Sequence, residues 1–394
     1  MTRHPHPPEP CPPPALSAAP DGARVRVAPD GARVRVVRPG DLTDRELDAW
    51  RRFQGLSPAL ESPHLCPEYV RLVAAVRPGV AVAVAERGGE TAGFFPFQRR
   101  GAVGKPVGGP LSDCQAVLAA PWWEWDPEAL VRAAGVSVQD FTHLRAEQRA
   151  FAPFHRAVEV SHTIDLRRGF DDYVGARKEH GRWLPQTSSG LPHQTLERAR
   201  RLERRHGPLR FTLHDPDPAM LRRLIAWKSA QYKRTGVPDV FARRWTVDLL
   251  ERIHAAQSPH FAGVLSTLSV GGTTVAAHMG MRSSSVLHWW FPAYDVAHAK
   301  LSPGAILLME VCRHAARAGI RTVELGAGAE PYKLLVADGG IEVAAAFVGS
   351  ASPPFWYRHA RYAVEAFAAR LPIGPAARLP EKLFRRLDMA VQFR

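Results

Sequence analysis

One short pattern occurs twice in this chain. An apolar, strand-like run leads into a Gly-Gly pair, and a threonine and a second apolar run follow, around Gly88-Gly89 and again around Gly271-Gly272. A Gly-Gly pair between two apolar runs predicts a tight β-hairpin. Because the two hairpins are separated by far more residues than one repeat of a solenoid, we predict two similar domains in tandem.

The length of the chain agrees with two domains. A single hydrophobic core seldom grows beyond about 250–300 residues, and this chain has 394. We expect the two domains at 33–170 and 208–350, joined by a basic helical linker at 171–207. A disordered tail rich in Pro, Ala and Gly precedes them at 1–32, and amphipathic helices follow at 351–394.

The N-terminal region contains a direct repeat. The octapeptide PDGARVRV occurs at Pro20–Val27 and again at Pro29–Val36. A recent tandem duplication explains such a repeat. We therefore expect the second copy to form the first strand of the fold and the first copy to be surplus.

Both halves show the same predicted order of elements: a strand, two helices, antiparallel strands, a helix and a last strand. This order is typical of an α+β or mixed α/β domain with a mostly antiparallel central sheet flanked by helices. The chain contains neither GxGxxG nor GxxxxGK[ST], the motifs of Rossmann and P-loop proteins. We therefore exclude those two kinds of nucleotide chemistry.

Charge and cysteine content narrow the class of protein further. The formal net charge of +14 favours anionic partners such as phosphates, nucleic acid or a membrane surface, although an Arg-rich, Ala-rich composition also reflects codon bias. Cys11, Cys66, Cys114 and Cys312 form no CxxC pair, so we expect no structural zinc and a reduced, cytoplasmic protein. The N-terminal residues lack the apolar run of a signal peptide, and no run reaches the roughly 18–20 residues of a membrane span.

Two places carry residues suited to chemistry. A helix predicted to begin near Gly304 is preceded by Ser302 and Pro303, and the free backbone N–H groups at such a start bind anions. Lys300 adds a positive charge just upstream. The alternative is an ordinary, well-capped helix without a ligand.

The second place is GAGAEPYKLL, Gly326–Leu335, which follows the strand-like RTVEL. Gly326 and Gly328 let the backbone turn sharply or approach a ligand closely. Glu324 lies on the strand just before them, and a carboxylate near a phenol and an ammonium group forms an acid–base set. The alternative is a salt-bridged corner between a strand and a helix.

These stretches also carry a resemblance. WWFPAYDVAHAKLSPGAILLMEVCRHAARAGIRTVELGAGAEPYK (289–333) resembles the signature of the CelD-like, BioF-related acetyltransferase family of the GNAT superfamily. WKSAQYKRTGVPDVFARRW (227–245) is similar to that family's preceding helix pair, and GFFPFQRRGAVGKPVGGPLSDCQAVL (93–118) to its N-terminal half. The resemblance covers roughly residues 34–350. It implies two GNAT-like domains built like the FemABX peptidyltransferases.

The resemblance also implies a place for the co-substrate. In GNAT folds an acyl-CoA lies between two splayed central strands, which would be 285–291 and 321–325 here, and its pyrophosphate sits on the N-terminus of the next helix. In the usual pyrophosphate loop a Gln or Arg stands where this chain has Lys300, and a glycine stands where it has Pro303. The pyrophosphate would contact Lys300, Ser302, Gly304 and Ala305.

Acyl transfer to an amine assigns chemical roles to the remaining residues. As hypotheses, Glu324 accepts the proton of the amine, Tyr332 protonates the leaving thiolate, and Lys333 helps to stabilise the oxyanion. No covalent enzyme intermediate is expected, because the chain shows no convincing Ser-His-Asp or Cys-His grouping. The residues expected to bind the acceptor are Lys228, Gln231, Tyr232, Asp295, Glu330 and Asp113.

Other residues are assigned to packing. PWWEWDP (121–127) can stack on a sugar ring, but we expect it to be buried between the domains. His278 and His288 lie on apolar strands and are expected to be packed core histidines. No histidines show HxxxH or HExxH spacing, so we predict no metal. The amphipathic segment after residue 352 is expected to dock on the second domain, with contact to a membrane surface as the alternative.

The sequence thus predicts a cytoplasmic GNAT-type N-acyltransferase that uses acetyl-CoA or another acyl-CoA. A small-molecule or glycan amine would accept the acyl group, in cell-envelope or exopolysaccharide (cellulose-type) biosynthesis. Two alternatives stay open. One is a FemABX-like transferase dependent on aminoacyl-tRNA, which is the only case in which we expect a nucleic-acid partner. The other is a non-catalytic GNAT-like scaffold of a polysaccharide synthase.

Overall fold

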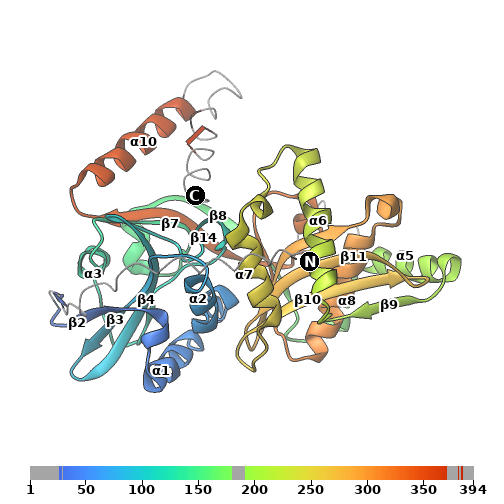
Figure 1. The fold of residues 1–394 in the computed structure, drawn as a ribbon, viewed down its shortest axis with the longest axis horizontal. Helices are drawn as coiled ribbons and strands as arrows, with labels where there is room; N and C mark the ends of the chain where they lie inside the picture. Colours follow the sequence, from blue (N-terminus) through green and yellow to red (C-terminus); the bar gives the residue numbers. More distant parts are fainter. Residues whose placement is uncertain (1–25, 29, 180–190, 371–379, 381–382, 385–394) are drawn as a thin grey trace, which may run out of the picture.

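Two lobes lie side by side in this protein and share one long sheet (Figure 1). The computed structural model describes residues 26–28, 30–179, 191–370, 380 and 383–384. The strands follow one another in the order β1-β2-β3-β4-β5-β7-β14-β8-β13-β12-β11-β10-β9, and β6 pairs with β4. Most neighbours are antiparallel, which confirms the predicted mixed α/β class.

The first lobe contains most elements of the first half of the chain. Its strands are β1 (Arg26–Val27), β2 (Arg33–Val37), β3 (Val80–Arg87), β4 (Glu90–Arg100), β5 (Val103–Lys105), β6 (Leu118–Ala119) and β7 (Val138–Arg145). Its helices are α1 (Asp44–Gln54), α2 (Pro67–Ala74) and α3 (Pro127–Ala133). Thr43 and Glu46 form a capping box that starts α1, and α1 buries Leu47, Trp50 and Phe53 against the sheet.

The predicted linker forms α4 (Phe170–Glu179) and α5 (Leu191–His206), and both helices pack against α8 (Pro303–Arg317) of the second lobe. Residues 180–190 between them lie outside the described part of the chain. The strands of the second lobe are β9 (Leu209–Thr212), β10 (Ala262–Val270), β11 (Thr273–Arg282), β12 (Val286–Tyr294) and β13 (Thr322–Ala327). Its helices are α6 (Pro218–Thr235), α7 (Arg244–Ala255), α8 and α9 (Pro331–Val336).

Both predicted hairpins are present. β3 pairs with β4 across Gly88-Gly89, and β10 pairs with β11 across Gly271-Gly272. All four glycines have positive φ, between 55° and 84°. Two successive residues with positive φ form the type I′ turn that suits the twist of a hairpin, and glycine adopts this conformation without strain.

The start of the fold differs from the prediction. Arg26 and Val27, expected to lie in the disordered tail, form β1 and pair with β2. Because Arg26 and Val27 end the first PDGARVRV copy, the two copies pair with each other at their RV residues. Residues 1–25 lie outside the described part of the chain.

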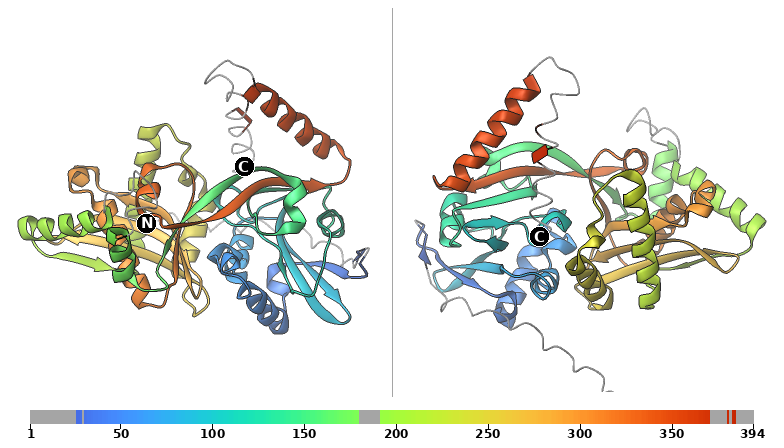
Figure 2. Two further views of the ribbon diagram at one scale, coloured as in Figure 1. Left: turned by 180° about the vertical axis from the view of Figure 1, so that it is seen from behind. Right: turned by 45° about the horizontal axis from the view of Figure 1, so that its top comes forward.

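Two strands are exchanged between the lobes. β8 (His155–Asp165) follows the first lobe in sequence, yet it pairs with β13 of the second lobe. β14 (Gly339–Gly349) follows the second lobe and pairs with β7 of the first. β8 and β14 also pair with each other, and Figure 2 shows them running between the lobes. The ranges 33–170 and 208–350 therefore each contribute one strand to the lobe formed mainly by the other.

Helices cover both faces of the second part of the sheet. α6 and α7 bury Leu224, Leu250 and Ile253 on one face, in a core that continues into the first lobe, where α7 contacts α2. α8 buries most of its side chains on the other face, among them Leu307 and Val311. No described helix is long and apolar enough to cross a membrane.

The last described helix, α10 (Pro353–Arg370), meets the sheet at β7 and β14. Arg358 forms an ion pair with Asp140 on β7, and Phe347 on β14 contacts the rings of Phe355 and Tyr362. These contacts lie between Phe355 and Tyr362, and Figure 1 shows the C-terminal end of α10 rising away from the sheet. α10 therefore docks in part on β7, a strand that the first half of the chain supplies.

Candidate active site

The two central strands of the second lobe pair only briefly and then separate. β12 and β13 are parallel partners over three positions, Val286–His288 with Thr322–Glu324. Beyond Glu324, β13 turns towards β8 through a register shift and through Gly326, whose φ is +77°. β12 continues along β11 to Tyr294. A gap therefore opens between β12 and β13 at the pair His288–Glu324.

The start of α8 lies beyond the end of β12. The chain passes through η7 (Val296–Leu301) to Ser302, which has φ 53° and is the single non-glycine residue with positive φ among those described. A non-glycine residue held in this conformation is strained, and such residues are common at ligand sites. The carbonyl of Ser302 accepts hydrogen bonds from Ala305 and Ile306. The N–H of Gly304 stands in the first turn, where an α-helix offers it no acceptor.

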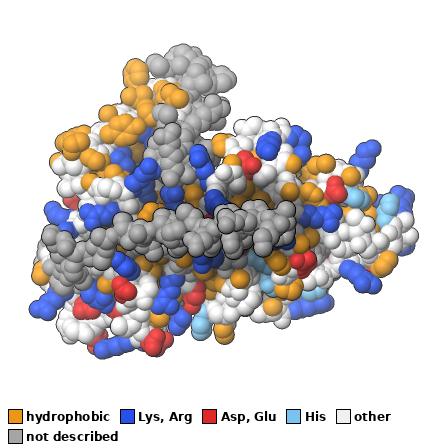
Figure 3. Space-filling model, in the orientation of Figure 1, with side chains coloured by type: hydrophobic (Ala, Val, Ile, Leu, Met, Phe, Trp, Pro, Cys, Tyr) orange, Lys and Arg blue, Asp and Glu red, His pale blue; other side chains and the backbone are white. Residues whose placement is uncertain are grey.

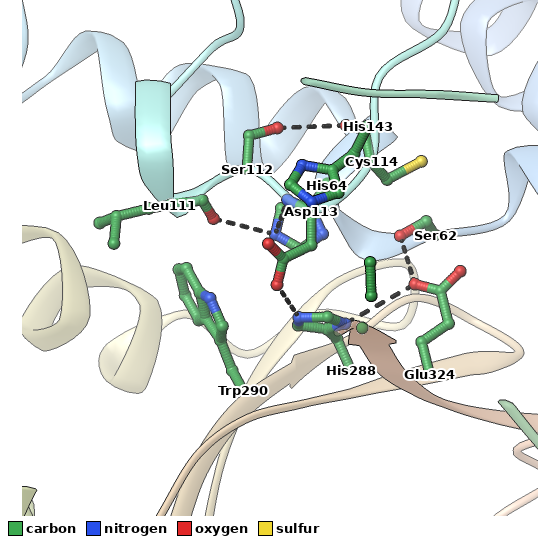
Figure 4. A network of polar contacts seen from close by, with 12 residues as sticks. Ser62, His64, Leu111, Ser112, Asp113, Cys114, His143, His288, Trp290 and Glu324 are labelled. Atoms are coloured by element: carbon green, nitrogen blue, oxygen red, sulfur yellow. Dashed lines mark hydrogen bonds and ion pairs between the residues drawn. The ribbon is translucent and has the colours of Figure 1, made fainter. Parts of the chain in front are cut away.

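A chain of charged side chains crosses from the first lobe to the mouth of this gap (Figure 4). Arg145, at the end of β7, forms a buried ion pair with Glu324 on β13. Ser62 donates a hydrogen bond of 2.7 Å to the same carboxylate. His288 lies 3.7 Å from Glu324 through Nδ1, and its Nε2 lies 3.0 Å from Oδ2 of Asp113. The last paired residues of β12 and β13 are thus held by three residues of the first lobe.

Opposite charges set the protonation of this network. Burial alone would raise the pKa of Glu324, but Arg145 and His288 outweigh it and hold this pKa well below its usual range. The hydrogen bond with His288 does the same to the pKa of Asp113. Burial alone would lower the pKa of His288, but Asp113 and Glu324 raise it to about 9. His288 is therefore a buried imidazolium between two carboxylates at neutral pH.

One loop of the first lobe makes most of these contacts to the second. It contains η2 (Pro58–Leu60) and η3 (Pro63–Leu65). Glu61 accepts hydrogen bonds from Ser285 and Arg321, which lie beside β12 and β13. His64 contacts the edge of His288, with ring centroids 4.7 Å apart. Burial and the neighbouring charge of His288 lower the pKa of His64 to about 3, so this imidazole stays neutral.

The same side chains include a donor set suited to a divalent metal. One ligand atom each of His64, Asp113 and His288 lies within 4.8 Å of the others. The three residues come from distant segments, so the search for local HxxxH spacing could not detect them. In this structure His288 and Asp113 satisfy each other with a direct hydrogen bond of 3.0 Å. We therefore describe the set as a hydrogen-bonded network.

The GAGAEPYK stretch forms a turn at the end of β13, and polar contacts of Lys333 hold this turn. Lys333 is buried, and its Nζ donates to the carbonyl of Ala327 at 2.7 Å and to that of Gly326 at 3.4 Å. It also forms an ion pair of 3.0 Å with Glu330. These three acceptors occupy the three donors of the ammonium group. Tyr332 lies next to it with 37% of its surface exposed.

Three of the predicted acceptor residues lie on α6, which packs on β12 at the opposite side of the gap: Lys228, Gln231 and Tyr232. Lys228 on α6 is buried, donates a 3.0 Å hydrogen bond to the carbonyl of Pro292 on β12, and lies over the ring of Tyr232. Burial lowers the pKa of Lys228 to about 8, although Glu330, from the β13 side, acts to raise it. Gln231 is half-buried on the same helix. Asp295 instead caps η7 through the N–H of Ala297.

The aromatic stretch at 121–127 lies apart from this network. Trp123 is buried in the first-lobe core and donates a 2.7 Å hydrogen bond to Asp30, and Trp125 contacts Phe151. A cavity of about 400 Å³ next to them is bordered by β2 and α3. Only Trp123 and Pro127 of this stretch are buried, within the first lobe, and Trp122 is exposed, so the stretch is not buried between the domains as we expected.

Comparison with known proteins agrees with this geometry. Residues 193–334 match the family described as "Acetyltransferase (GNAT) domain", a stretch that contains the gap and the start of α8. The solved structure of FemX is similar over 79% of this chain and 98% of its own, with 8% identity and a TM-score of 0.53. The fold is therefore that of GNAT proteins, and the family match indicates an acyltransferase.

Two further solved structures are similar at lower scores. One is the C-terminal domain (DUF2156) of a putative lysylphosphatidylglycerol synthetase from Agrobacterium fabrum, with 12% identity, 76% of this chain and 91% of that chain covered, and a TM-score of 0.45. The other is a tandem GNAT protein from the clavulanic acid biosynthesis pathway, with 12% identity, 82% and 100% covered, and a TM-score of 0.44. A comparison with curated proteins finds no match.

Sequence reasoning missed several members of the network. Ser62, His64 and Arg145 carried no recognisable motif, and His288 was expected to be a packed core histidine. It is buried, but its partners are charged. His278 does pack, stacked on Trp289 with centroids 4.0 Å apart. One local signal existed, because SPALESPHLC (57–66) places Glu61, Ser62 and His64 among prolines and buried apolar residues.

The buried ion pair gives a stability prediction. Arg145→Met leaves the carboxylate of Glu324 buried without its main partner, so we expect a loss of about 3–5 kcal/mol in the free energy of unfolding. Adding Glu324→Gln should recover part of that loss. Arg244→Met, which breaks the exposed pair with Asp248, is the control and should change stability by less than about 0.5 kcal/mol. Urea unfolding measures all three, and a loss below about 1 kcal/mol for Arg145→Met would contradict the geometry.

His288 gives a prediction for pH. Its pKa is about 9 in the fold and 6.5 in the unfolded chain, so its contribution to stability is complete below pH 6.5 and lost as the pH rises through 9. The stability difference between wild type and His288→Asn should therefore shrink between these pH values, by on the order of 3 kcal/mol. Lys228 titrates in both proteins, so taking the difference removes its effect. Urea unfolding from pH 6 to 10 tests this, and a constant difference would show that His288 is not charged.

Proposed function

We propose that this protein is an N-acyltransferase that moves an acyl group from acetyl-CoA or a related acyl-CoA to an amine. One observation carries the proposal: β12 and β13 separate after the pair His288–Glu324, in front of the start of α8. The gap leaves backbone groups on β12 without a strand partner, and an extended pantetheine arm can bind such groups as an additional strand would. The family match over residues 193–334 supports the same conclusion.

The donor would bind along this gap with its pyrophosphate at α8. The helix is 15 residues long, and its N-terminus offers the N–H of Gly304 and a positive dipole. Lys300 is exposed on η7 two residues before Ser302 and adds a positive charge. Pro303 holds the first helical position, so the loop reaches the helix without the first glycine that is usual in GNAT proteins. In this proposal the thioester end of the donor points towards His288.

The acceptor amine would enter between α6 and α9. It must lose a proton before its nitrogen attacks the thioester carbonyl, and Lys228, with its pKa lowered to about 8, suits a general base near neutral pH. The tetrahedral intermediate then expels CoA as a thiolate, and Tyr332, exposed at the edge of the gap, is placed to protonate it. Glu330 and Asp113 supply negative charge that attracts a cationic amine.

Two predicted catalytic residues receive positioning roles in this proposal. Glu324 is held ionised by Arg145, so it is too weak a base to take a proton from an amine. We assign it to orienting His288. Lys333 uses its donors on the carbonyls of Ala327 and Gly326 and on Glu330. We assign it to holding the turn that opens the gap.

The class of acceptor rests on the resemblance to the CelD-like family. That resemblance favours an amino sugar or another amine of cell-envelope or exopolysaccharide metabolism. The alternative donor is an aminoacyl-tRNA, which the similarity to FemX favours. Exposed arginines on α5 would supply phosphate contacts in that case: Arg198, Arg200, Arg201, Arg204 and Arg205.

Calorimetric titration of acetyl-CoA into the full chain tests the donor site. We expect Gly304→Glu to abolish binding, because a carboxylate would face the pyrophosphate. The fold should tolerate the change, since a Cβ at Gly304 meets Tyr294 at an ordinary 3.7 Å. Gly40→Glu, at a glycine with nothing within 4 Å, is the matched control and should bind like wild type.

Failure of wild type to bind acetyl-CoA or longer acyl-CoAs would contradict the proposal. Binding of tRNA that weakens steeply with salt, and that Gly304→Glu leaves unchanged, would then support the aminoacyl-tRNA alternative. If wild type binds neither acyl-CoA nor tRNA, the result favours the non-catalytic scaffold.

Lys228 gives a kinetic prediction. If it is the base, kcat/KM for an amine acceptor should rise with pH and level off above about 8. Lys228→Met should lower kcat/KM by about 100-fold or more and remove this inflection. Lys233→Met, at an exposed position of the same helix, should behave like wild type. An unchanged pH profile in Lys228→Met would exclude Lys228 as the base.

A further inference from the structure

Helix α10 docks on the protein through a mixed face of charged and aromatic side chains. Arg358 pairs with Asp140 on β7, and Phe355, His359 and Tyr362 contact Phe347 on β14. The other large apolar side chains face outwards. Those most exposed are Trp356 at 61%, Tyr357 at 54%, Val364 at 48% and Phe367 at 65%.

The outward residues form one continuous stripe. Trp356, Ala360, Ala363, Val364 and Phe367 follow the spacing of a single helix face, and all are exposed. In Figure 3 apolar side chains gather over α10, at the top left of the molecule. The rings of Trp356 and Phe367 are exposed to water on a helix that extends away from the sheet. An exposed apolar face of this kind indicates an interaction site.

The dimensions of the stripe argue against a second copy of the chain. α10 has 18 residues and is therefore about 27 Å long. A stripe about 10 Å wide on such a helix offers roughly 270 Å², whereas a stable interface buries about 800 Å² on each partner. The helix is also not apolar enough to cross a membrane.

Composition and charge favour a lipid surface. Tryptophan and tyrosine prefer the boundary between lipid headgroups and acyl chains. From residue 353 onwards the sequence has eight Lys and Arg and three Asp and Glu, and Arg370 is exposed at the end of α10. Positive charge beside an apolar stripe is the pattern of helices that lie in the plane of an anionic membrane.

We propose that α10 is a membrane-surface anchor. Its Trp356–Phe367 stripe inserts into the headgroup region of an anionic bilayer, while its mixed face stays attached to β7 and β14. This anchor is independent of the donor site, so acyl-CoA binding in solution does not require it. It would hold the enzyme beside acceptors that are made or displayed at a membrane.

Vesicle flotation of the full chain tests the anchor. Wild type should float with vesicles of phosphatidylcholine mixed with phosphatidylglycerol, and much less with phosphatidylcholine alone. The double variant Trp356→Ser/Phe367→Ser should bind the anionic vesicles at least about 30-fold more weakly, because two inserted aromatic rings are lost. Trp122→Ser, at a tryptophan 49% exposed on the first lobe, is the matched control and should float like wild type.

Four results would overturn the proposal. In the first, wild type does not float with anionic vesicles, and in the second the double variant floats as wild type does. The other two would show a different partner for the stripe. A mass that doubles with concentration in wild type but not in the double variant would make the stripe a contact between copies. A large drop in melting temperature of the variant would show that the rings pack within the chain.

Discussion

The buried contact between Arg145 and Glu324 is the constraint on which the rest of the site depends. In the sheet, β14 and β8 lie between the strands that carry these two residues. Neighbouring strands lie about 4.8 Å apart, so in a flat sheet β7 and β13 would be roughly 14 Å apart. Direct contact of the two side chains therefore requires the sheet to curve at β14 and β8. A buried charge pair is unfavourable unless its groups find further partners. Arg145 donates to the carbonyl of Ala59, and Glu324 accepts from Ser62 and lies near His288, whereas Nη1 of Arg145 has no hydrogen-bond partner among the described residues.

This contact makes the first lobe responsible for the shape of the gap in the second. Glu324 is the last residue of β13 paired with β12, and its carboxylate is fixed by Arg145 and Ser62. Beyond Glu324, β13 stays paired only with β8, a strand that the first half of the chain supplies. The two GNAT-like lobes thus have different tasks. One presents the gap and the helix start, and the other holds the gap open and contributes Asp113 to its inner end.

The features that could be predicted from the sequence are those that depend on local backbone conformation. A Gly-Gly pair needs positive φ wherever it lies in space, so both hairpins were correctly placed, and Ser302-Pro303 marked the start of α8 for the same reason. The network could not be predicted in this way, because Ser62, Asp113, Arg145 and His288 come from four segments that are far apart in the sequence. His288 was judged from its own apolar strand, and nothing in that strand indicates that Asp113 lies opposite.

The two glycines of GAGAEPYK, which suggested a catalytic site in the sequence, have a structural role: they set the direction in which β13 continues. Gly326 has φ +77°, and a Cβ there would lie 3.6 Å from Oδ2 of Asp113 and 3.9 Å from the ring of His288. A side chain would therefore strain the backbone and crowd the inner end of the gap. Gly328 has φ +120°, a conformation that other residues rarely adopt, and a Cβ there would require the carboxylate of Glu330, 2.6 Å away, to shift. Lys333 then ties the carbonyls of this turn. The motif turns β13 away from β12 directly after Glu324, and the groups that can move a proton, such as Lys228, stand around the space that this turn creates.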